Sequence, residues 1–522
     1  MAARQPPLAA PPRAAARWEQ VAIALAATMV VVVALANSAH KSAWTDEMYS
    51  VITASRPLGG TVRRSLQYEL QPPLYFSLLN LWLSVGTLWS RLGASIPFAR
   101  LLSTACAVGC LLTLAAIGRL LKIRGPIPLF VLAALTPGLI WASAEARGYA
   151  LVLWLTSATL YFFLRLVTNP PARLAPTAVA YAVVAYLALL TSFYAGFVLA
   201  GQWIAAAIVG DRRGFRWQTA ALAAVAIAFL PIVPAVIKAV ANHPTAPTPL
   251  GADGHPLRAL LRLFLDAPLG GGPLFGRPAI LAIALAILAA IPIARWLAHT
   301  PADRAERVLA VAAAIPFVVF ATLRITNAAL VEPRHTLVAA PALLTLWALW
   351  LSRTPPSPVR TTAATALVAL LVAALYSFER NMLELSDWRG AARIVSASAR
   401  PDERIFLAPP QEALPFGYYY KGPAPVAGLP TNVRLDVYDV SRSKIDSASQ
   451  ITAQFADQRV GPGVWAVLAW RVEPVGSCGD RILESVLHAR FDTVTSTTVH
   501  GISVFHARGP AITPRQELTA CS

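Results

Sequence analysis

Two adjacent carboxylates, Asp46 and Glu47, are the residues of this sequence best suited to acid–base chemistry. They follow the first long apolar run closely and stand between Trp44 and Tyr49. Carboxylates beside a bilayer are costly to hold there, so they are functional residues by default. The same spacing also fits the start of a helix, with Asp46 as the capping oxygen. The residues alone leave both interpretations open.

A second group of polar residues marks the start of the next apolar run, in Gln71-Pro72-Pro73-Leu74-Tyr75. Proline favours the first turn of a helix and stops one that arrives from the loop before it. The motif is therefore either ordinary punctuation or a device that fixes where the loop meets the membrane. In the second case Gln71 and Tyr75 would face the same site as the carboxylates.

Two charged islands lie between later apolar runs, one with Glu145 and Arg147 and the other with Arg334 and His335. A guanidinium group grips phosphate through two parallel hydrogen bonds, so Arg334 with His335 could hold a lipid phosphate. Glu145 and Arg147 are likewise candidate substrate-binding residues. The alternative is that these are interfacial loop charges whose side chains reach to the membrane surface.

The composition shows what must position these residues. Of 522 residues, 56% are apolar and only 13% are charged, against roughly 25% charged in soluble domains. The mean hydropathy is +0.56. The net charge of +18 lies entirely before residue 379, because the remainder holds 15 basic and 15 acidic residues. This pattern indicates a polytopic membrane protein that contacts membrane lipids and has basic cytoplasmic loops. It offers no basic patch for nucleic acid.

Eleven apolar runs are predicted to span the membrane, which gives a cytoplasmic N-terminus and an extracytoplasmic C-terminus. Most basic loops agree with this orientation, but Arg119, Lys122 and Arg124 come out external and Glu145 cytoplasmic. The predicted spans are 20–37, 74–90, 99–118, 126–143, 148–168, 176–207, 218–239, 278–296, 308–328, 336–352 and 361–378.

The predicted domains are a disordered cytoplasmic tail (1–19), a transmembrane domain (20–378) with a first external loop at about 38–73, and an extracytoplasmic α/β domain (379–522). In the last, the patterns predict helices at 387–399 and 481–488 and strands at 404–407, 464–470, 493–499 and 502–506.

Two features of the α/β domain allow more than one interpretation. Cys478 and Cys521 could pair as a disulfide in an oxidising compartment. The aromatic residues of the domain could form a sugar-stacking face or belong to its core; they are Tyr418, Tyr419, Tyr420, Trp465 and Trp470.

Taken in order, these motifs resemble the GT-C superfamily of integral-membrane glycosyltransferases. The nearest resemblance is to the family 39 group, which includes protein O-mannosyltransferases and aminoarabinose transferases. The resemblance extends over about residues 20–420. The motifs that carry it are Asp46-Glu47, Gln71-Pro72-Pro73-Leu74-Tyr75, Arg100 to Ser103, Glu145-Ala146-Arg147-Gly148-Tyr149, Pro333-Arg334-His335 and Asp387-Trp388-Arg389-Gly390.

The resemblance implies a multi-pass enzyme of the cell membrane that takes a hexose or pentose from a polyprenyl-phosphate-linked donor. The acceptor would be a protein, a lipid or a polysaccharide on the external face. The family's catalytic acid maps to Asp46. Many relatives carry His-Tyr in a middle span where this chain has Ser192-Phe193-Tyr194, and Arg-Tyr where it has Arg334-His335. No cofactor is certain, and a divalent metal stays open because one carboxylate pair is not a complete ligand set.

An inverting transfer follows as the mechanistic hypothesis. Asp46 would remove the acceptor's proton, Glu47 would orient the acceptor or tune Asp46, and Arg147 and Arg334 would stabilise the departing phosphate. The alternatives are a lipid-linked sugar transporter or flippase without transferase activity, and a non-catalytic scaffold that binds wall polymer. A transporter is expected to show internal repeats or charges in mid-span, and neither stands out.

Overall fold

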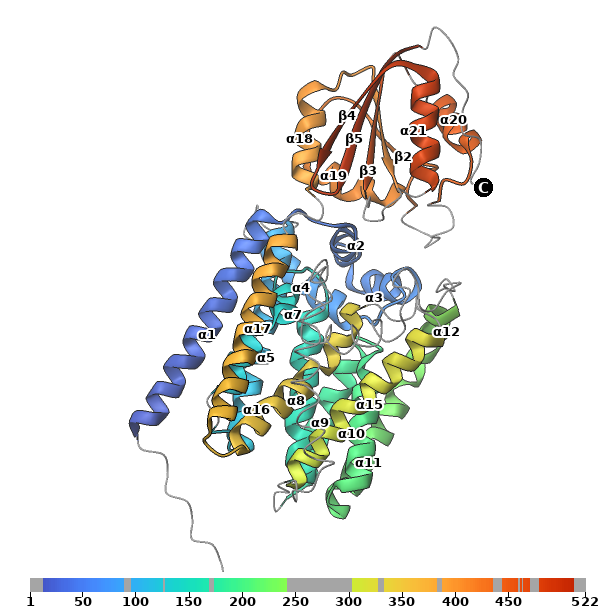
Figure 1. Cartoon of the computed structure of the whole chain (residues 1–522). Coiled ribbons are helices and arrows are strands. Elements are labelled where there is room, and N and C mark those ends of the chain that lie inside the picture. Colours follow the sequence, from blue (N-terminus) through green and yellow to red (C-terminus); the bar gives the residue numbers. More distant parts are fainter. Residues whose placement is uncertain are drawn as a thin grey trace, which may run out of the picture. The chain divides into compact units, whose positions relative to one another are not determined.

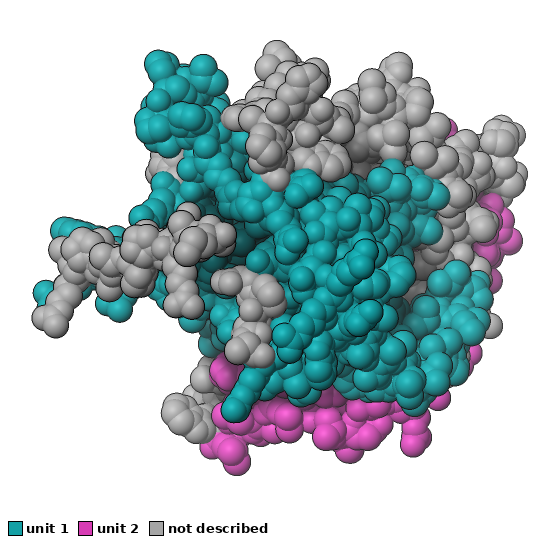
Figure 2. Space-filling model, turned by 90° about the horizontal axis from the view of Figure 1, so that it is seen from below, with its two compact units in different colours: residues 1–36, 100–377 teal, residues 37–99, 378–522 magenta. Residues whose placement is uncertain are grey.

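The structure is a computed structural model that describes residues 13–88, 95–124, 127–168, 173–241, 303–326, 333–382, 387–434, 444–458, 461, 463–469 and 478–510. The chain forms two compact units, coloured separately in Figure 2. Unit 1 comprises residues 1–36 and 100–377, and unit 2 comprises residues 37–99 and 378–522. The chain passes between them within helices α1, α5 and α17 (Figure 1).

Unit 1 is a bundle of apolar helices (Figure 1). Seven helices in the described ranges are long and apolar enough to cross a membrane, and α4, α9 and α10 are shorter apolar helices. The helices that lie wholly or mainly in this unit are α1 (Arg13–His40), α5 (Ile96–Leu120), α6 (Leu129–Ala134), α7 (Pro137–Ser143), α8 (Tyr149–Val167), α9 (Ala175–Leu189), α10 (Ala195–Val209), α11 (Arg212–Phe229), η1 (Leu230–Ile232), α12 (Val233–Ala241), α15 (Arg304–Thr326), η3 (Pro333–Ala339), α16 (Ala340–Arg353) and α17 (Pro358–Met382).

Contacts between helix termini define one end of the bundle, which we call the Glu19 end. Arg119 Nε, in the last turn of α5, lies 2.8 Å from Glu19 Oε1, near the start of α1. Five residues after Arg119, the amide of Arg124 donates to Ser352 Oγ in the last turn of α16, at 2.8 Å. The start of α1 and the carboxyl ends of α5 and α16 therefore lie together.

The opposite end, which we call the Arg147 end, is defined by the first turns of α5. Ser103 Oγ donates to the Arg147 carbonyl at 3.2 Å, and Thr104 Oγ1 donates to the Ser143 carbonyl at 2.9 Å. The loop between α7 and α8 thus lies beside the amino-terminal part of α5. Glu145, which the sequence count placed with the cytoplasmic loops, lies at the opposite end of the bundle from Arg119.

Two of the predicted spans differ in the structure. The run at 74–90 forms α4 (Leu74–Leu88), which belongs to unit 2 and packs against α2 (Thr45–Ala54) and α3 (Leu58–Gln67). The run at 176–207 is not one helix but two, α9 and α10, separated at residues 190–194. A count that leaves out α4 and takes α9 and α10 as separate passes would put Arg119 on the cytoplasmic side and Glu145 outside, and would leave the loops after α10 on their predicted sides.

The other predicted spans correspond to the helices of the bundle, with two qualifications. The run at 126–143 is broken into α6 and α7, because Pro137 begins a new helix at this point. The predicted span at 278–296 lies outside the described residues. The fold class predicted from the sequence, a polytopic helical membrane protein with a small C-terminal α/β domain, is confirmed.

The C-terminal part of unit 2 is built on a mixed five-stranded sheet in the order β2-β1-β3-β5-β4 (Figure 1). The β1 strand is parallel to β2 and β3, whereas β5 is antiparallel to β3 and β4. The strands are β1 (Arg404–Ala408), β2 (Val426–Gly428), β3 (Gly463–Ala469), β4 (Phe491–Val499) and β5 (Ile502–Pro510).

Helices cover both faces of this sheet because the buried strand residues alternate between two apolar clusters. Phe406 and Ala466 belong to the cluster with α20 and α21, and Ile405 and Trp465 belong to the cluster with α18 and α19. All four predicted strands and both predicted helices are confirmed, whereas β2, η4, α19 and α20 were not predicted. The helices are α18 (Trp388–Ser398), η4 (Pro410–Glu412), α19 (Ala413–Tyr419), α20 (Ala448–Asp457) and α21 (Cys478–Arg490).

The first loop completes unit 2 with helices α2 (Thr45–Ala54), α3 (Leu58–Gln67) and α4. Asn80 of α4 donates to the carbonyls of Ala54 and Arg56 at 2.7 and 2.8 Å, which fixes the carboxyl end of α2. Leu81, Val85 and Leu88 of α4 are exposed. This apolar surface explains why the segment has the composition of a membrane span.

Candidate active site

Asp46 and Glu47 occupy the first turn of α2, and their side chains differ in exposure. Glu47 is completely buried, and its Oε2 accepts a hydrogen bond from the Trp44 amide at 3.4 Å. Asp46 is partly exposed. The helix-start interpretation is thus correct for the pair, but the capping carboxylate is Glu47. Asp46 is therefore the more accessible member of the pair.

The C-terminal domain contacts the residues that lead into α2. The Ala43 amide donates to the Tyr419 hydroxyl at 2.8 Å, and Thr45 Oγ1 donates to Glu412 Oε1 at 2.7 Å. The Ser42 hydroxyl donates to Asp387 Oδ1 at 3.4 Å. Three residues within a four-residue segment are therefore held by side chains that lie more than 340 residues away in the sequence.

The other side of α2 packs against α3 and the loop that follows it. Thr53 Oγ1 donates to Glu69 Oε1 at 2.5 Å and accepts from Arg64 Nε at 3.0 Å. The rings of Tyr49 and Tyr68 meet edge to face, with their centroids 5.8 Å apart. Burial, followed by the neighbouring Tyr68 and the carboxylates of Glu69 and Glu412, raises the pKa of Tyr49. Its hydroxyl therefore stays protonated beside α2.

Gln71 and Tyr75 lie in the same unit as the carboxylates. Gln71 is partly exposed, and its amide donates to the Ser65 carbonyl at 2.9 Å, which closes the end of α3. Tyr75 is the second residue of α4 and is 2% exposed, with its ring edge to face against Phe76. Gln71 thus remains available to a ligand, whereas Tyr75 is mainly a packing residue.

In unit 1 the Arg147 end holds a concentration of buried charge. Arg100, Glu145 and Arg147 are 1%, 0% and 5% exposed. Ser103, one turn after Arg100, contacts the Arg147 backbone, as described above. Charges buried this deeply in a membrane domain make this end a candidate functional site.

Arg334 and His335 lie at the same end, on η3. The His335 ring stacks on Tyr194, with centroids 4.2 Å apart and planes 15° apart. Tyr194 directly precedes α10. Leu337 of η3 lines a small apolar cavity with Leu139 of α7 and Leu153 of α8. The elements that carry Arg334 and Arg147 are therefore neighbours in the bundle.

Several residues outside the predicted set prove to be structural. The three tyrosine hydroxyls of the 418–420 run each accept a backbone amide: Ile96 to Tyr418 at 3.4 Å, Ala43 to Tyr419 at 2.8 Å and Ala424 to Tyr420 at 3.0 Å. Tyr420 belongs to the core. The hydroxyls of the run therefore fasten parts of unit 2 together, and Tyr418 and Tyr419 are partly exposed.

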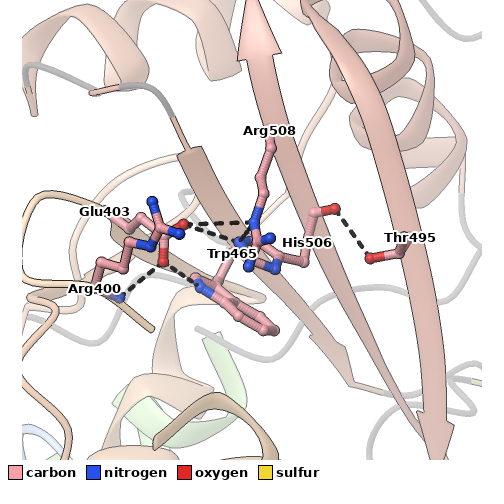
Figure 3. Close-up of polar contacts among 6 residues, drawn as sticks. All are labelled: Arg400, Glu403, Trp465, Thr495, His506 and Arg508. Atoms are coloured by element: carbon pink, nitrogen blue, oxygen red, sulfur yellow. Dashed lines mark hydrogen bonds and ion pairs between the residues drawn. The ribbon is translucent and has the colours of Figure 1, made fainter. Parts of the chain in front are cut away.

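Trp465 belongs to a buried polar cluster in the sheet (Figure 3). Its indole nitrogen donates to Glu403 at 2.9 Å, and its ring stacks on His506 at 3.7 Å. Glu403 also lies 2.9 Å from His506 Nε2. This cluster joins β1, β3 and β5.

Trp470 and Cys521 lie outside the described residues, and Cys478 is disulfide-bonded.

Among the residues that the structure describes, no group of three or more His, Cys, Asp or Glu side chains is arranged to hold a metal ion.

The most informative residue that sequence reasoning missed is Glu412, which is 2% exposed. It follows β1 at the carboxyl edge of the parallel strands, where sites in α/β folds commonly lie. The position of Glu412 after a predicted strand could have marked it as a candidate. Its contact with Thr45 in the first loop could not have been found from the sequence.

No protein-family model and no curated protein sequence matches the chain. Solved structures do. ArnT from Cupriavidus metallidurans, in the apo state, superposes with a TM-score of 0.54 at 15% identity, over 94% of this chain and 98% of that one.

The oligosaccharyltransferase of Archaeoglobus fulgidus, solved with Zn and sulfate, gives a TM-score of 0.52 at 12% identity, over 85% of this chain and 67% of that one. The archaeal oligosaccharyltransferase AglB from the same organism was solved with an inhibitory peptide and a dolichol-phosphate. It gives a TM-score of 0.50 at 13% identity, over 96% of this chain and 75% of that one.

These likenesses are to members of the GT-C superfamily and extend over nearly the whole chain. The resemblance inferred from the ordered motifs is therefore confirmed at the level of the fold. The protein is a multi-pass membrane protein with the GT-C fold and a C-terminal sheet domain.

Proposed function

We propose that the protein is a membrane glycosyltransferase that moves a sugar from a polyprenyl-phosphate-linked donor to an acceptor at the external membrane face. The observation that carries the proposal is a partly exposed acid, Asp46, at the start of α2 in a chain with the GT-C fold. AglB, which shares this fold, was solved with a dolichol-phosphate and a peptide.

The charges at the two ends of the bundle support an external site. Lys122 and Arg124 follow α5, and Arg212 and Arg213 begin α11, at the Glu19 end or in the loops on that side. Since cytoplasmic loops collect Lys and Arg, the Glu19 end is the cytoplasmic one. The N-terminus would then be cytoplasmic. The Arg147 end, the first loop and the C-terminal domain would be extracytoplasmic, as the sequence led us to expect.

The proposed reaction is a displacement at the anomeric carbon. The acceptor oxygen attacks as its proton passes to the Asp46 carboxylate, and the bond from the anomeric carbon to the phosphate oxygen breaks. Polyprenyl phosphate leaves with the electron pair. Attack from the face opposite the leaving group inverts the anomeric configuration. The phosphate needs charge stabilisation rather than protonation, because it is already an anion.

The residues of the Arg147 end provide that stabilisation in the proposal. Arg147 and Arg334 bind the phosphate, and the buried carboxylate of Glu145 positions its cationic neighbours. His335 and Tyr194 present one stacked aromatic surface, which suits a sugar ring or an isoprene unit. In the first loop, Glu47 fixes the start of α2, and Gln71 contacts the acceptor. Tyr75 positions α4.

The experiment that tests the proposal also identifies the sugar and the acceptor. Purified protein is incubated with a panel of labelled polyprenyl-phosphate hexoses and pentoses and a crude membrane fraction as the acceptor source. We expect release of polyprenyl phosphate and a new labelled product. A lipid-linked sugar transporter or a scaffold would leave every donor intact in detergent, and that result would reject the proposal. Parallel reactions with EDTA, Mg²⁺ or Mn²⁺ decide metal dependence.

A further inference from the structure

The start of α2 lacks a side-chain cap of the usual kind. Its N-cap residue is Trp44, whose side chain carries no oxygen to accept the amides of the first turn. Glu47 accepts from the Trp44 amide, and the Glu47 and Met48 amides donate to the Trp44 carbonyl. Contacts from other elements add to these in fixing the direction of α2, and Asp46 lies in that first turn.

Those contacts come from three residues of the C-terminal domain, Asp387, Glu412 and Tyr419, which we call the brace. Each is fixed within its own domain. Asp387 caps α18 by accepting from the Gly390 amide at 2.9 Å. Glu412 ends the short η4 turn behind β1. The Tyr419 ring lies at the carboxyl end of α19, with the Arg389 guanidinium 5.2 Å from its centroid.

Arg389 adds a second connection from the same domain. Its amide donates to Ser42 Oγ at 3.2 Å, and its guanidinium donates to the carbonyls of Ala39 and Lys41. The segment from Ala39 to Thr45 is thus bonded to α18, η4 and α19 along its whole length. Glu412 is the brace residue whose partner, Thr45, directly precedes Asp46 in the chain.

The proposed function requires Asp46 to be held within a fraction of an ångström of the acceptor hydroxyl, since small misplacements are costly in rate. We propose that the brace is the positioning element for Asp46, so that the C-terminal domain is part of the catalytic machinery rather than an appendage. Glu412 is its principal positioning residue and acts through Thr45. This inference rests on the proposed function.

The substitutions that test the brace come in matched pairs. Thr45→Val keeps the shape but removes the donor, whereas Thr45→Ser keeps the donor. Glu412→Leu removes the acceptor, whereas Glu412→Gln keeps one. Tyr419→Phe breaks the bond to Ala43, whereas Tyr420→Phe breaks a bond inside the C-terminal domain. Glu403→Gln perturbs a buried glutamate just before β1 that bonds to Arg400, Trp465 and His506 of the C-terminal domain (Figure 3).

The first measurement is hydrogen exchange over residues 43–54 in the full chain in detergent, which needs no substrate. We expect faster exchange in Thr45→Val, Glu412→Leu and Tyr419→Phe, and wild-type exchange in their matched controls. Unchanged exchange of this segment in Thr45→Val and Glu412→Leu would overturn the brace.

The second measurement is transfer from the best donor of the panel. Thr45→Val should lower kcat by about 10-fold to 100-fold with little change in donor KM, the result of a misaligned base. Glu412→Gln should stay near wild type. An equal loss in well-folded Glu412→Gln and Glu412→Leu would mean that the charge itself is needed, and would overturn the positioning role.

The two proposals can fail separately. If Asp46→Asn transfers sugar like the wild type, the proposed function fails whatever the brace does to α2. If Asp46→Asn is inactive but the single variant Thr45→Val has the wild-type kcat, only the positioning role fails. Where both hold, Thr45→Val added to Asp46→Asn lowers the residual rate no further, because the two changes act through one group.

Discussion

At the scale of single residues, the chemistry divides between partly exposed and buried charges. Asp46 is partly exposed, while Glu47, Glu145 and Glu412 are almost wholly buried. A buried carboxylate that accepts specific donors fixes structure, whereas an accessible one can meet a substrate. This difference in exposure supports the proposed role of Asp46 as the base, which the resemblance already implied for this member of the pair.

Arg334 gives a direct prediction at this scale. Arg334→Ala should raise the donor KM by about 10-fold or more, since a charge-assisted contact to phosphate is worth about 1.5–3 kcal/mol, and should leave the fold largely intact. Arg334→Lys should lose less because the charge remains. The check is donor titration at saturating acceptor. An unchanged KM in Arg334→Ala would remove this residue from the donor site.

The Glu403–His506 pair predicts how stability depends on pH. Burial lowers the pKa of His506, and the neighbouring Glu403 offsets this only in part. Burial would raise the pKa of Glu403, but hydrogen bonds from the Arg400 amide, His506 and Trp465 lower it overall. Both groups bind fewer protons when folded than when unfolded, so stability falls as pH falls. The loss begins below about 6.5 for the histidine and below about 4.3 for the glutamate.

Thermal unfolding of the full chain at pH 7.0 and 5.5 checks this sign. Wild type should lose stability between these values, and His506→Gln, which cannot titrate there, should lose less. A larger loss in the variant would show that protonated His506 is the stabilising form and would contradict the assignment.

At the scale of elements, close approach between α10 and α15 gives a prediction for the bundle. A Cβ added at Gly201 would lie 2.9 Å from the Ala312 carbonyl oxygen and 3.1 Å from Pro316 Cδ. Gly201→Ala should therefore destabilise the protein by about 1–3 kcal/mol, as overpacking does. At Gly196 the nearest contact is an ordinary 3.6 Å, so Gly196→Ala should be neutral or slightly stabilising. Thermal unfolding in detergent compares the two, and equal effects would refute the close packing.

The elements also show how far sequence could lead. Every regular strand and helix predicted in the C-terminal domain was found, because alternation and helical periodicity are local signals. The α9–α10 break was missed, since Ser192-Phe193-Tyr194 holds neither charge nor proline to mark it. The run at 74–90, predicted as a span, forms α4 of unit 2, a shorter apolar helix with exposed leucines.

The candidate site was predictable where its residues form short motifs, as with Asp46-Glu47 and Arg334-His335. Glu412 was not, because its contact with Thr45 joins positions 367 apart. Tyr194 was noted only as a departure from the family pattern. Its stacking on His335 depends on how α10 and η3 meet, which is a tertiary property.

At the scale of the whole molecule, the corrected helix count predicts a topology that labelling can test. With a membrane-impermeant maleimide added from outside, Lys122→Cys should stay unlabelled until the membrane is opened, because it follows α5 toward the Glu19 end. Asp492→Cys, exposed on β4, should label at once. Native Cys106 and Cys110 are buried and free, so the parent protein sets the background. External labelling of Lys122→Cys would reverse the orientation.

The most direct test of the whole proposal is single-turnover transfer by Asp46→Asn, with donor binding measured in the same preparation. The substitution is nearly isosteric and removes only the base. We expect donor binding to remain and the transfer rate to fall by at least about 100-fold, the low end for general base catalysis. Asp492→Asn, another exposed acid of unit 2, should transfer like the wild type. A folded Asp46→Asn protein that binds donor and transfers sugar at the wild-type rate would contradict the assignment of the base.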